Sequence, residues 1–166
     1  MEWEKEIMKV KEKLNEVSEE VKKTEELEEQ ILQYYRKLLQ IIASTPYKPK
    51  RNEIELFRIG GRAYGPGNVY SDTWYLVLTE GTVAVEEHHI YYMTASRTVS
   101  IIHRGKDAID FCLKIFEERA KEYGFEDELK RVITELKENL DKASQYFKAR
   151  NKKLTEVVNK LATVLS

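Results

Sequence analysis

Aromatic and cationic side chains are interleaved in the middle of the chain, and together they could bind a single-stranded nucleic acid. The stretch YSDTWYLVLTEGTVAVEEHHIYYM, from Tyr70 to Met93, holds five tyrosine and tryptophan residues within 24 positions. Sequence-tolerant binding needs rings on which bases stack and cations that follow the phosphate backbone, and each stacked base contributes about 1–3 kcal/mol. The candidate binding residues are Lys48, Lys50, Arg51, Arg58, Arg62, Tyr64, Tyr70, Trp74, Tyr75, Tyr91, Tyr92, Arg97 and Arg104.

The alternation of side chains along a strand distributes these rings over both faces of a sheet. Trp74 shares a face with Leu76 and Leu78, whereas Tyr75 shares a face with Val77. Some rings must therefore belong to the core and others can form a stacking surface. The pattern leaves open which face of the sheet is accessible.

The residue types that usually carry catalysis are few and poorly placed. His88 and His89 are adjacent, so in an extended strand they point to opposite faces and cannot join one metal site without a bulge. We expect both to be surface histidines at the end of a strand. Cys112 lies in an apolar helical pattern, which indicates a buried small hydrophobe. The glycine-rich segment GGRAYGPG lacks the Gly-Lys-Ser/Thr ending of a phosphate-binding loop. We expect neither an enzyme nor a bound cofactor or metal.

Strands, turns and one helix must position the candidate residues. Alternating β-branched and aromatic residues, separated by turn sequences such as Glu80-Gly81, predict strands at 53–59, 73–79, 82–87, 90–95 and 98–104. A helix is predicted from Lys106 or Asp107 to Gly124, and its apolar face must cover one side of the sheet. The predicted fold class is α+β, with a small antiparallel sheet of four or five strands covered by a helix.

Heptad repeats occupy both ends of the chain. In the C-terminal segment, apolar residues recur in alternating steps of four and three from Leu129 to Val164, and only Arg150 interrupts them. The N-terminal segment has the same period from Trp3 to Ile41, apart from two successive steps of three at Thr24 and Leu27. A sustained 3.5-residue period with charged flanks predicts coiled-coil helices. Long coiled-coil-like helices should therefore flank the sheet.

These patterns divide the chain into three segments: an N-terminal heptad helix at 1–44, a nucleic-acid-binding sheet and helix at 45–124, and a C-terminal heptad helix at 125–166. The two helical arms could pair with each other as a hairpin, or with the arms of other protomers as a homodimer or homotetramer. The stretch 142–160 has six cations and one anion, and the chain through Thr45 has eight cations and eleven anions. The basic stretch could thus contact phosphate or complement the acidic arm.

Composition limits the class of protein. The 166 residues are 42% hydrophobic and 34% charged with a formal net charge of −1, which argues against a uniformly basic DNA-coating protein but not against a local basic patch. One cysteine forms no disulfide within the chain, and no apolar run approaches the roughly 18 residues of a membrane span. We expect a cytoplasmic protein without a membrane partner. The bias toward Glu and Lys is typical of hyperthermophile proteins.

The arrangement from Ile54 to Leu165 resembles the ThermoDBP family and its related proteins, which are archaeal single-stranded DNA-binding proteins. The resembling parts are WYLVLTEGTVAVEEHHIYYM, TVSIIHRGKDAIDFCLKIFEERAKEYG and the C-terminal zipper. The resemblance implies oligomerisation through coiled-coil helices and a sheet cleft that binds DNA. Its apolar floor would be Tyr70, Trp74, Tyr75, Tyr91 and Tyr92, and its basic rim Arg58, Arg62, Arg97 and Arg104.

A second resemblance is to prefoldin-like chaperone subunits. The segment NEIELFRIGGRAYGPGNVYSDTWYLVLTEGTVAVEE resembles their β region, and helical arms at both ends suit such an assembly. The stretch Ile90–Gly124 departs from this pattern, because strands and a separate helix stand where the second arm should begin. Single-stranded nucleic-acid binding is therefore the first expectation, and a molecular chaperone is the alternative. The sequence does not decide between DNA and RNA.

Overall fold

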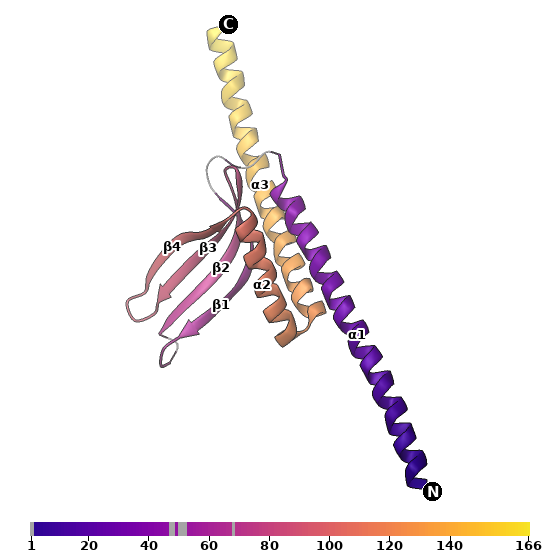
Figure 1. Ribbon diagram of the computed structural model, residues 1–166. Coiled ribbons are helices and arrows are strands. Elements are labelled where there is room, and N and C mark those ends of the chain that lie inside the picture. Colours follow the sequence, from indigo (N-terminus) through magenta and orange to yellow (C-terminus); the bar gives the residue numbers. More distant parts are fainter. Residues whose placement is uncertain (1, 47–48, 50–52, 68) are drawn as a thin grey trace.

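The computed structural model describes residues 2–46, 49, 53–67 and 69–166, and it has the α+β architecture that the sequence predicts. The candidate residues Lys48, Lys50 and Arg51 lie outside the described residues. Along the chain the elements are α1 (Glu2–Ala43), β1 (Ile54–Tyr64), β2 (Tyr70–Thr79), β3 (Thr82–Tyr91), β4 (Ser96–Arg104), α2 (Lys106–Tyr123) and α3 (Phe125–Leu165). In Figure 1 the sheet lies on one side of the molecule and the three helices on the other.

The sheet is an antiparallel meander of four strands in the order β1-β2-β3-β4. Two predicted boundaries were wrong. β1 does not end before Gly60-Gly61 but continues to Tyr64, and the segments at 82–87 and 90–95 share one strand, β3, that ends at Tyr91. Gly61 is needed inside β1, because a Cβ atom there would lie 2.6 Å from the Asp72 carbonyl oxygen of β2. Gly61 therefore allows a close approach of two backbones.

Two irregularities in β1 concentrate its apolar residues on one side. The register between β1 and β2 shifts between Glu55 and Phe57 and again between Arg58 and Gly60. Each shift leaves one additional residue in β1, as in a β-bulge, and a bulge bends the strand and re-aims its side chains. Leu56, Phe57 and Ile59 consequently all join the hydrophobic core.

The core lies between the sheet and α2. Leu76 and Val85 from the sheet pack with Cys112 and Phe116 from α2, and each of these four side chains is at most 2% exposed. The C-terminal part of α1 closes the core, where the Tyr35 ring stacks on Phe116 with 4.2 Å between ring centroids. Cys112 is the buried small hydrophobe that the helical pattern predicts, and burial raises the pKa of its thiol.

Side chains of α3 satisfy the backbone of the edge strand β1. The Asn139 side-chain amide donates to the Leu56 carbonyl oxygen at 2.8 Å, and Arg131 donates to the Arg58 carbonyl oxygen at 2.9 Å. The Arg58 backbone N–H donates to the Glu135 carboxylate at 2.9 Å. An open edge strand is a template for pairing with other strands, so these bonds protect it. They also fix α3 along the sheet.

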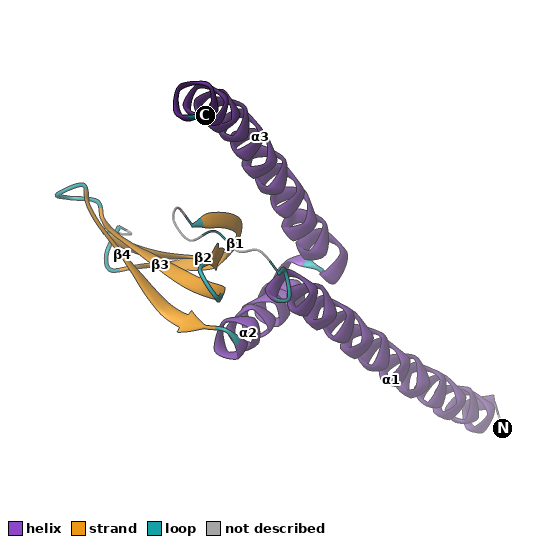
Figure 2. Ribbon diagram, turned by 90° about the horizontal axis from the view of Figure 1, so that it is seen from above, coloured by secondary structure: helices purple, strands orange, loops and turns teal. Residues whose placement is uncertain are grey.

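The long arms form as predicted, but they do not fold into a hairpin. α1 and α3 run in roughly the same direction and project from opposite ends of the molecule (Figures 1 and 2). The heptad seams on the projecting ends are exposed, as shown by Leu14 at 62% and Leu154 at 45%. The pairing of the two arms within one chain is therefore absent from the described residues. No helix in that part of the chain has both the length and the apolar character needed to cross a membrane.

Candidate nucleic-acid interface

Strand register sorts the described candidate residues onto two faces of the sheet. We call the face turned toward α2 the inner face, and the opposite one the outer face. Both faces carry rings, as the alternation predicts, so the floor implied by the family resemblance is divided between them. The inner face carries Arg62, Tyr64, Tyr70, Trp74 and Tyr91, and the outer face carries Arg58, Tyr75, Tyr92, Arg97 and Arg104.

Helix α2 covers only half of the inner face. Near the β2–β3 turn, inner-face residues such as Leu76 and Val83 are buried beneath the helices. Toward the β1–β2 and β3–β4 turns, the inner face is open and Tyr70 is 39% exposed. We call this open part the distal half of the sheet. In Figure 1 its two turns point away from the helices.

A row of three tyrosines crosses the distal half of the inner face. Tyr64 is the cross-strand partner of Tyr70, and Tyr70 is the partner of Tyr91. The Tyr70 and Tyr91 ring centroids lie 4.8 Å apart, and the His89 ring lies 5.9 Å from Tyr70. Directly opposite side chains on one face are close enough to form a continuous surface. The row Tyr64, Tyr70 and Tyr91, which we call the tyrosine row, offers adjacent π-faces from three strands.

Arg62 connects the tyrosine row to the deeper part of the inner face. Its guanidinium lies 5.0 Å from the Tyr64 ring centroid and 5.4 Å from that of Trp74, within the range of cation–π attraction. Trp74 is only 7% exposed, packs edge-on against Phe111 of α2 and donates its indole N–H to Glu87 at 2.9 Å. Arg62 is thus a cation held over rings, and Trp74 forms the floor where sheet and helix meet.

A cleft of about 350 Å³ lies between this floor and α2. The residues that α2 contributes to it were not among the sequence candidates. They include the cations Lys114 and Arg119 and the ring of Tyr123, which lies 5.0 Å from the Arg119 guanidinium, together with the anions Glu118 and Glu122. Their spacing of three and four residues marks one stripe of α2 beside its core face, and that is the pattern from which they could have been found.

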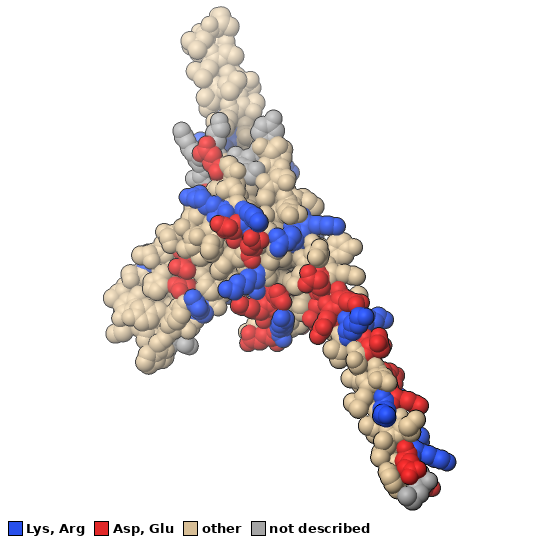
Figure 3. Space-filling model, in the orientation of Figure 1, with Lys and Arg blue, Asp and Glu red and all other residues tan. Residues whose placement is uncertain are grey.

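The carboxylates on the inner face have hydrogen-bond partners on neighbouring side chains. Asp72 lies 2.5 Å from the His89 ring nitrogen Nδ1, and Glu87 accepts the Trp74 N–H. Burial, followed by a hydrogen bond to Asp72, raises the pKa of the Tyr64 hydroxyl. The carboxylates therefore hold the rings and the imidazole in place. Few charged side chains show over the sheet in the view of Figure 3.

The outer face is organised around His88. This residue is only 7% exposed, so the expectation of a surface histidine was wrong, whereas the opposite orientations of His88 and His89 are confirmed. Its Nε2 lies 2.5 Å from a Glu86 oxygen, the Arg97 guanidinium contacts Nδ1, and the Tyr75 ring centroid lies 4.7 Å away. Burial and then the charge of Arg97 lower the pKa of the imidazole. A neutral His88 that donates to Glu86 and accepts from Arg97 fits this geometry.

Glu53 completes this outer-face cluster. Its carboxyl is hydrogen-bonded to Glu86, and this bond, with burial second, raises the pKa of Glu53 to about 7. Arg104 lies close enough to oppose that shift. Arg104 thus lies near a carboxyl group, Arg97 contacts an imidazole, and Tyr92 bonds Ser71 at 2.9 Å. The outer face also has exposed cations, such as Arg58, but the row of three cross-strand tyrosines lies on the inner face.

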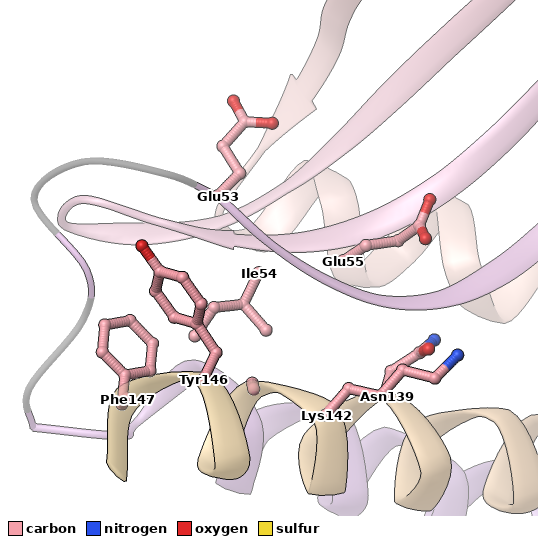
Figure 4. A pocket seen from close by; sticks show the side chains of 8 residues that line it. Glu53, Ile54, Glu55, Asn139, Lys142, Tyr146 and Phe147 are labelled. Atoms are coloured by element: carbon pink, nitrogen blue, oxygen red, sulfur yellow. The ribbon is translucent and has the colours of Figure 1, made fainter. Parts of the chain in front are cut away.

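A separate groove of about 410 Å³ lies between the start of β1 and α3. Figure 4 shows Tyr146 and Phe147 of α3 facing Ile54, whereas Glu53 and Glu55 point away. Lys142 is the only cation among the described residues that line it. The described part of the groove therefore offers a phosphate backbone a single cation.

No group of three or more His, Cys, Asp or Glu side chains is arranged to hold a metal ion within the described ranges. Comparison of the chain with protein-family models, curated proteins and solved structures gives no match. The chemistry of the inner face is therefore the basis for a functional proposal.

Proposed function

We propose that this protein binds single-stranded nucleic acid, DNA in the first instance, with little sequence preference. Bases stack on the tyrosine row, and the sugar–phosphate backbone of the strand lies along the cations at the opening of the cleft between the sheet and α2. Binding by stacking is tolerant of sequence because every base has a π-face. The resemblance to the ThermoDBP family points to the same activity, and we propose that the protein works as a homo-oligomer joined by its helical arms.

The observation that carries this proposal is the coincidence of three adjacent rings, one exposed and two half-buried, and one stacked cation on a single sheet face. Tyr64, Tyr70 and Tyr91 are cross-strand neighbours, and Arg62 lies over Tyr64 and Trp74. A purely structural role explains Trp74, which is buried, but it does not explain why Tyr70 stays 39% exposed beside two other rings. A row of rings in water is a costly arrangement unless a planar ligand covers it.

The charges on this face set the expected strength of binding. The cleft contributes Arg62, Lys114 and Arg119 against Glu118 and Glu122, and Arg119 also bonds Glu128 at 2.9 Å. Each neutralised phosphate of a single strand changes log K by about −0.7 per unit of log salt concentration. With one or two cations free to contact phosphate, we expect a slope of roughly −0.7 to −1.4. Stacking should therefore supply most of the affinity.

The test is a fluorescence-anisotropy titration of a labelled single strand of about 20 nucleotides at two salt concentrations. We expect saturable binding with this shallow salt dependence for strands of different base sequence. A duplex of the same sequence is the control and should bind more weakly, because its bases are already stacked on each other. Absence of binding to any single strand at low salt would contradict the proposal.

A second candidate function is a molecular chaperone of the prefoldin-like kind. The observation that favours it is the exposure of apolar side chains at both arm tips, with Trp3 at 57% and Leu165 at 79%. Against it, the arms project from opposite ends and do not form a hairpin. Suppression of the aggregation of an unfolded client, lost when Trp3 and Leu165 are both replaced by serine, would support this function over the first.

A further inference from the structure

The projecting ends of α1 and α3 carry long apolar seams that no other described part of the chain covers. The side chains of α1 are exposed from residue 2 to 27, and those of α3 from residue 144 to 165. A sustained heptad seam is a surface built for another helix. The seam residues are Trp3, Ile7, Val10, Leu14, Val17 and Val21 on α1, and Phe147, Leu154, Val157, Leu161 and Val164 on α3, each at least 38% exposed.

The two arms carry opposite net charges. Residues 2–27 hold nine anions and six cations, a net charge of −3, and residues 144–165 hold five cations and one anion, a net charge of +4. Ion pairs within the α1 arm join Lys9 to Glu6 and Lys13 to Glu16. None of the five cations on the α3 arm pairs with an acidic group in the described residues. The basic arm therefore lacks an acidic partner that the acidic arm could provide.

We propose that the partner of each arm is a second copy of this chain, joined by a two-fold axis so that α1 of one protomer packs antiparallel on α3 of the other. If like arms paired, an α1 arm of net charge −3 would face another of −3, and an α3 arm of net charge +4 would face another of +4. Like charges across a helix pair disfavour it, whereas flanking charges of opposite sign select the partner and the orientation. This inference specifies how the helical arms of the proposed homo-oligomer join, and it does not depend on nucleic-acid binding.

The arrangement of the arms suits this symmetry. Both helices run in roughly the same direction and project from opposite ends (Figures 1 and 2). A half-turn about an axis perpendicular to them therefore sets each α1 arm beside the partner's α3 arm, running the opposite way. Both contacts form together, and the assembly closes as a dimer.

The lengths of the two arms also correspond. At 1.5 Å per residue, residues 2–27 span about 39 Å and residues 144–165 about 33 Å. In Figure 3 the projecting end of α3 shows a face without Lys, Arg, Asp or Glu. Arg150, which interrupts that seam, makes no ion pair with the described part of the chain. A single polar residue in a seam can fix the register of a coiled coil, and an acidic partner arm would suit a cation there.

Two other ways of covering the arms fit these observations less well. Head-to-tail packing of parallel arms would extend into a filament and would leave an unpaired arm at each end. A nucleic-acid backbone could neutralise the cations of the α3 arm, but phosphates do not cover Leu154, Val157 or Leu161. The second copy accounts for the charge and the apolar seam together.

The test is sedimentation velocity on the full chain and on charge-reversal variants. Lys153 and Lys160 each precede a seam residue of α3 by one position, and Glu6 and Glu20 do the same on α1. These positions flank the seam, where interhelical ion pairs form. We expect wild type to be dimeric, and the double variant Lys153→Glu/Lys160→Glu to raise the dimer Kd roughly tenfold or more. Adding Glu6→Lys/Glu20→Lys in the same chain should recover part of the lost affinity, because an antiparallel register can set one of the swapped pairs face to face.

The matched control is Lys130→Glu/Lys137→Glu, which reverses two exposed charges of the same helix outside the arm and should leave the Kd unchanged. Pairing of like arms predicts the opposite sign, because Lys153→Glu/Lys160→Glu would then relieve repulsion and strengthen the dimer. A monomeric wild type, filaments that grow with concentration, or dimers that form only with added single-stranded DNA would each overturn the proposal.

Crosslinking checks the antiparallel direction independently. Antiparallel arms bring the tip of α1 beside the tip of the partner's α3, so cysteines introduced as Lys5→Cys and Ala162→Cys should be joined between chains by a bismaleimide. The pair Lys5→Cys and Lys148→Cys should not be joined. The native Cys112 is buried and does not compete. Crosslinking of the second pair but not of the first would show parallel arms and contradict the proposal.

Discussion

Arg62 is the residue on which the inner face depends most, because it contacts two rings and still presents a cation to the cleft. We expect Arg62→Ala to weaken binding of a single strand about tenfold, since a stacking contact and a phosphate contact are lost together. The slope of log K against log salt should become less negative by about 0.7. Anisotropy titrations at three salt concentrations measure both changes.

The control for Arg62 is Arg58, an exposed cation on the same strand that faces the other way. Arg58→Ala should change the affinity less than twofold, because nothing on the inner face is removed. Equal losses in the two variants would mean that binding follows the total charge of the strand and not its inner face.

Glu53 gives the outer face a dependence on pH. Its folded-state pKa of about 7 lies above the ordinary value of 4.5, so between these pH values the folded chain holds a proton that the unfolded chain releases. The free energy of unfolding therefore falls as pH rises through this window. The lowered pKa of His88 acts in the opposite direction, because stability is lost as pH falls below the unfolded value near 6.5.

The variant Glu53→Gln separates the two groups. Glutamine imitates the protonated carboxyl, so the variant should match wild type at pH 5 and exceed its stability at pH 8, when measured by urea unfolding. The two groups interact, so at pH 5 the comparison also includes a change in the pKa of His88, whereas at pH 8 His88 is neutral in both chains. If the difference between the chains is the same at both pH values, Glu53 is not protonated near neutral pH in the folded state.

At the scale of the elements, the sequence predicts helices better than sheet faces. The heptad period extends over five or more turns, so it marks α1 and α3 without help from the rest of the fold. Strand alternation places Trp74 and Tyr75 on opposite faces correctly, but it cannot say which face α2 covers or how far along it reaches. How far α2 covers the sheet depends on the bulges at Leu56 and Ile59, which curve β1. No local sequence pattern predicts these bulges.

The candidate site shows the same limit. Arg62 and the tyrosine row could be nominated from residue type alone, whereas Lys114 and Tyr123 joined the site only through the packing of α2 on the sheet. His88 was misjudged because its burial comes from Tyr75 and Arg97, which are distant in sequence. Residue type thus indicated the chemistry of the candidate site, and long-range packing decided which residues come together in it.

The attachment of α3 to the sheet depends on a buried ion cluster. Glu128 is 2% exposed, and Arg119 and Arg131 donate to it at 2.9 Å and 2.6 Å. Burial alone would raise the pKa of Glu128, but the hydrogen bonds from Arg131 and Arg119 outweigh it and lower the pKa. Arg131 also donates to the edge of β1, so one side chain serves both the charge cluster and the strand.

We expect Arg131→Ala to lower the free energy of unfolding by roughly 3–5 kcal/mol, because it leaves a buried carboxylate with one partner fewer. Lys130→Ala, one residue earlier and exposed, should change it by less than about 0.5 kcal/mol. Urea unfolding at pH 7 measures both. Because the pKa of Glu128 is lowered in the folded state, its contribution to stability is present above pH 4.5 and is lost as pH falls further. The decrease in the free energy of unfolding caused by Arg131→Ala should therefore be smaller in acid. A cost that is unchanged at pH 3 would contradict this role for the cluster.

At the scale of the whole molecule, binding and assembly occupy different regions. The open part of the inner face lies in the distal half of the sheet, and the seams lie on the ends of α1 and α3 that project beyond the body. Variants of the arms can therefore be tested for assembly while the inner face is intact, and variants of the rings can be tested for binding while the arms are intact. In a dimer, two inner faces on one particle would also strengthen binding to a long strand through effective concentration.

The measurement that tests the central claim most directly compares two double ring variants in the anisotropy titration. Tyr70→Ala/Tyr91→Ala removes two inner-face rings, and Tyr75→Ala/Tyr92→Ala removes two outer-face rings from neighbouring positions of the same strands and turn. Circular dichroism first confirms that both variants are folded. We predict that the inner-face variant loses at least about 30-fold in affinity for a single strand, at 1–3 kcal/mol for each stacked base, while the outer-face variant stays within about threefold of wild type. Equal losses, or a larger loss in the outer-face variant, would contradict the assignment of nucleic-acid binding to the inner face.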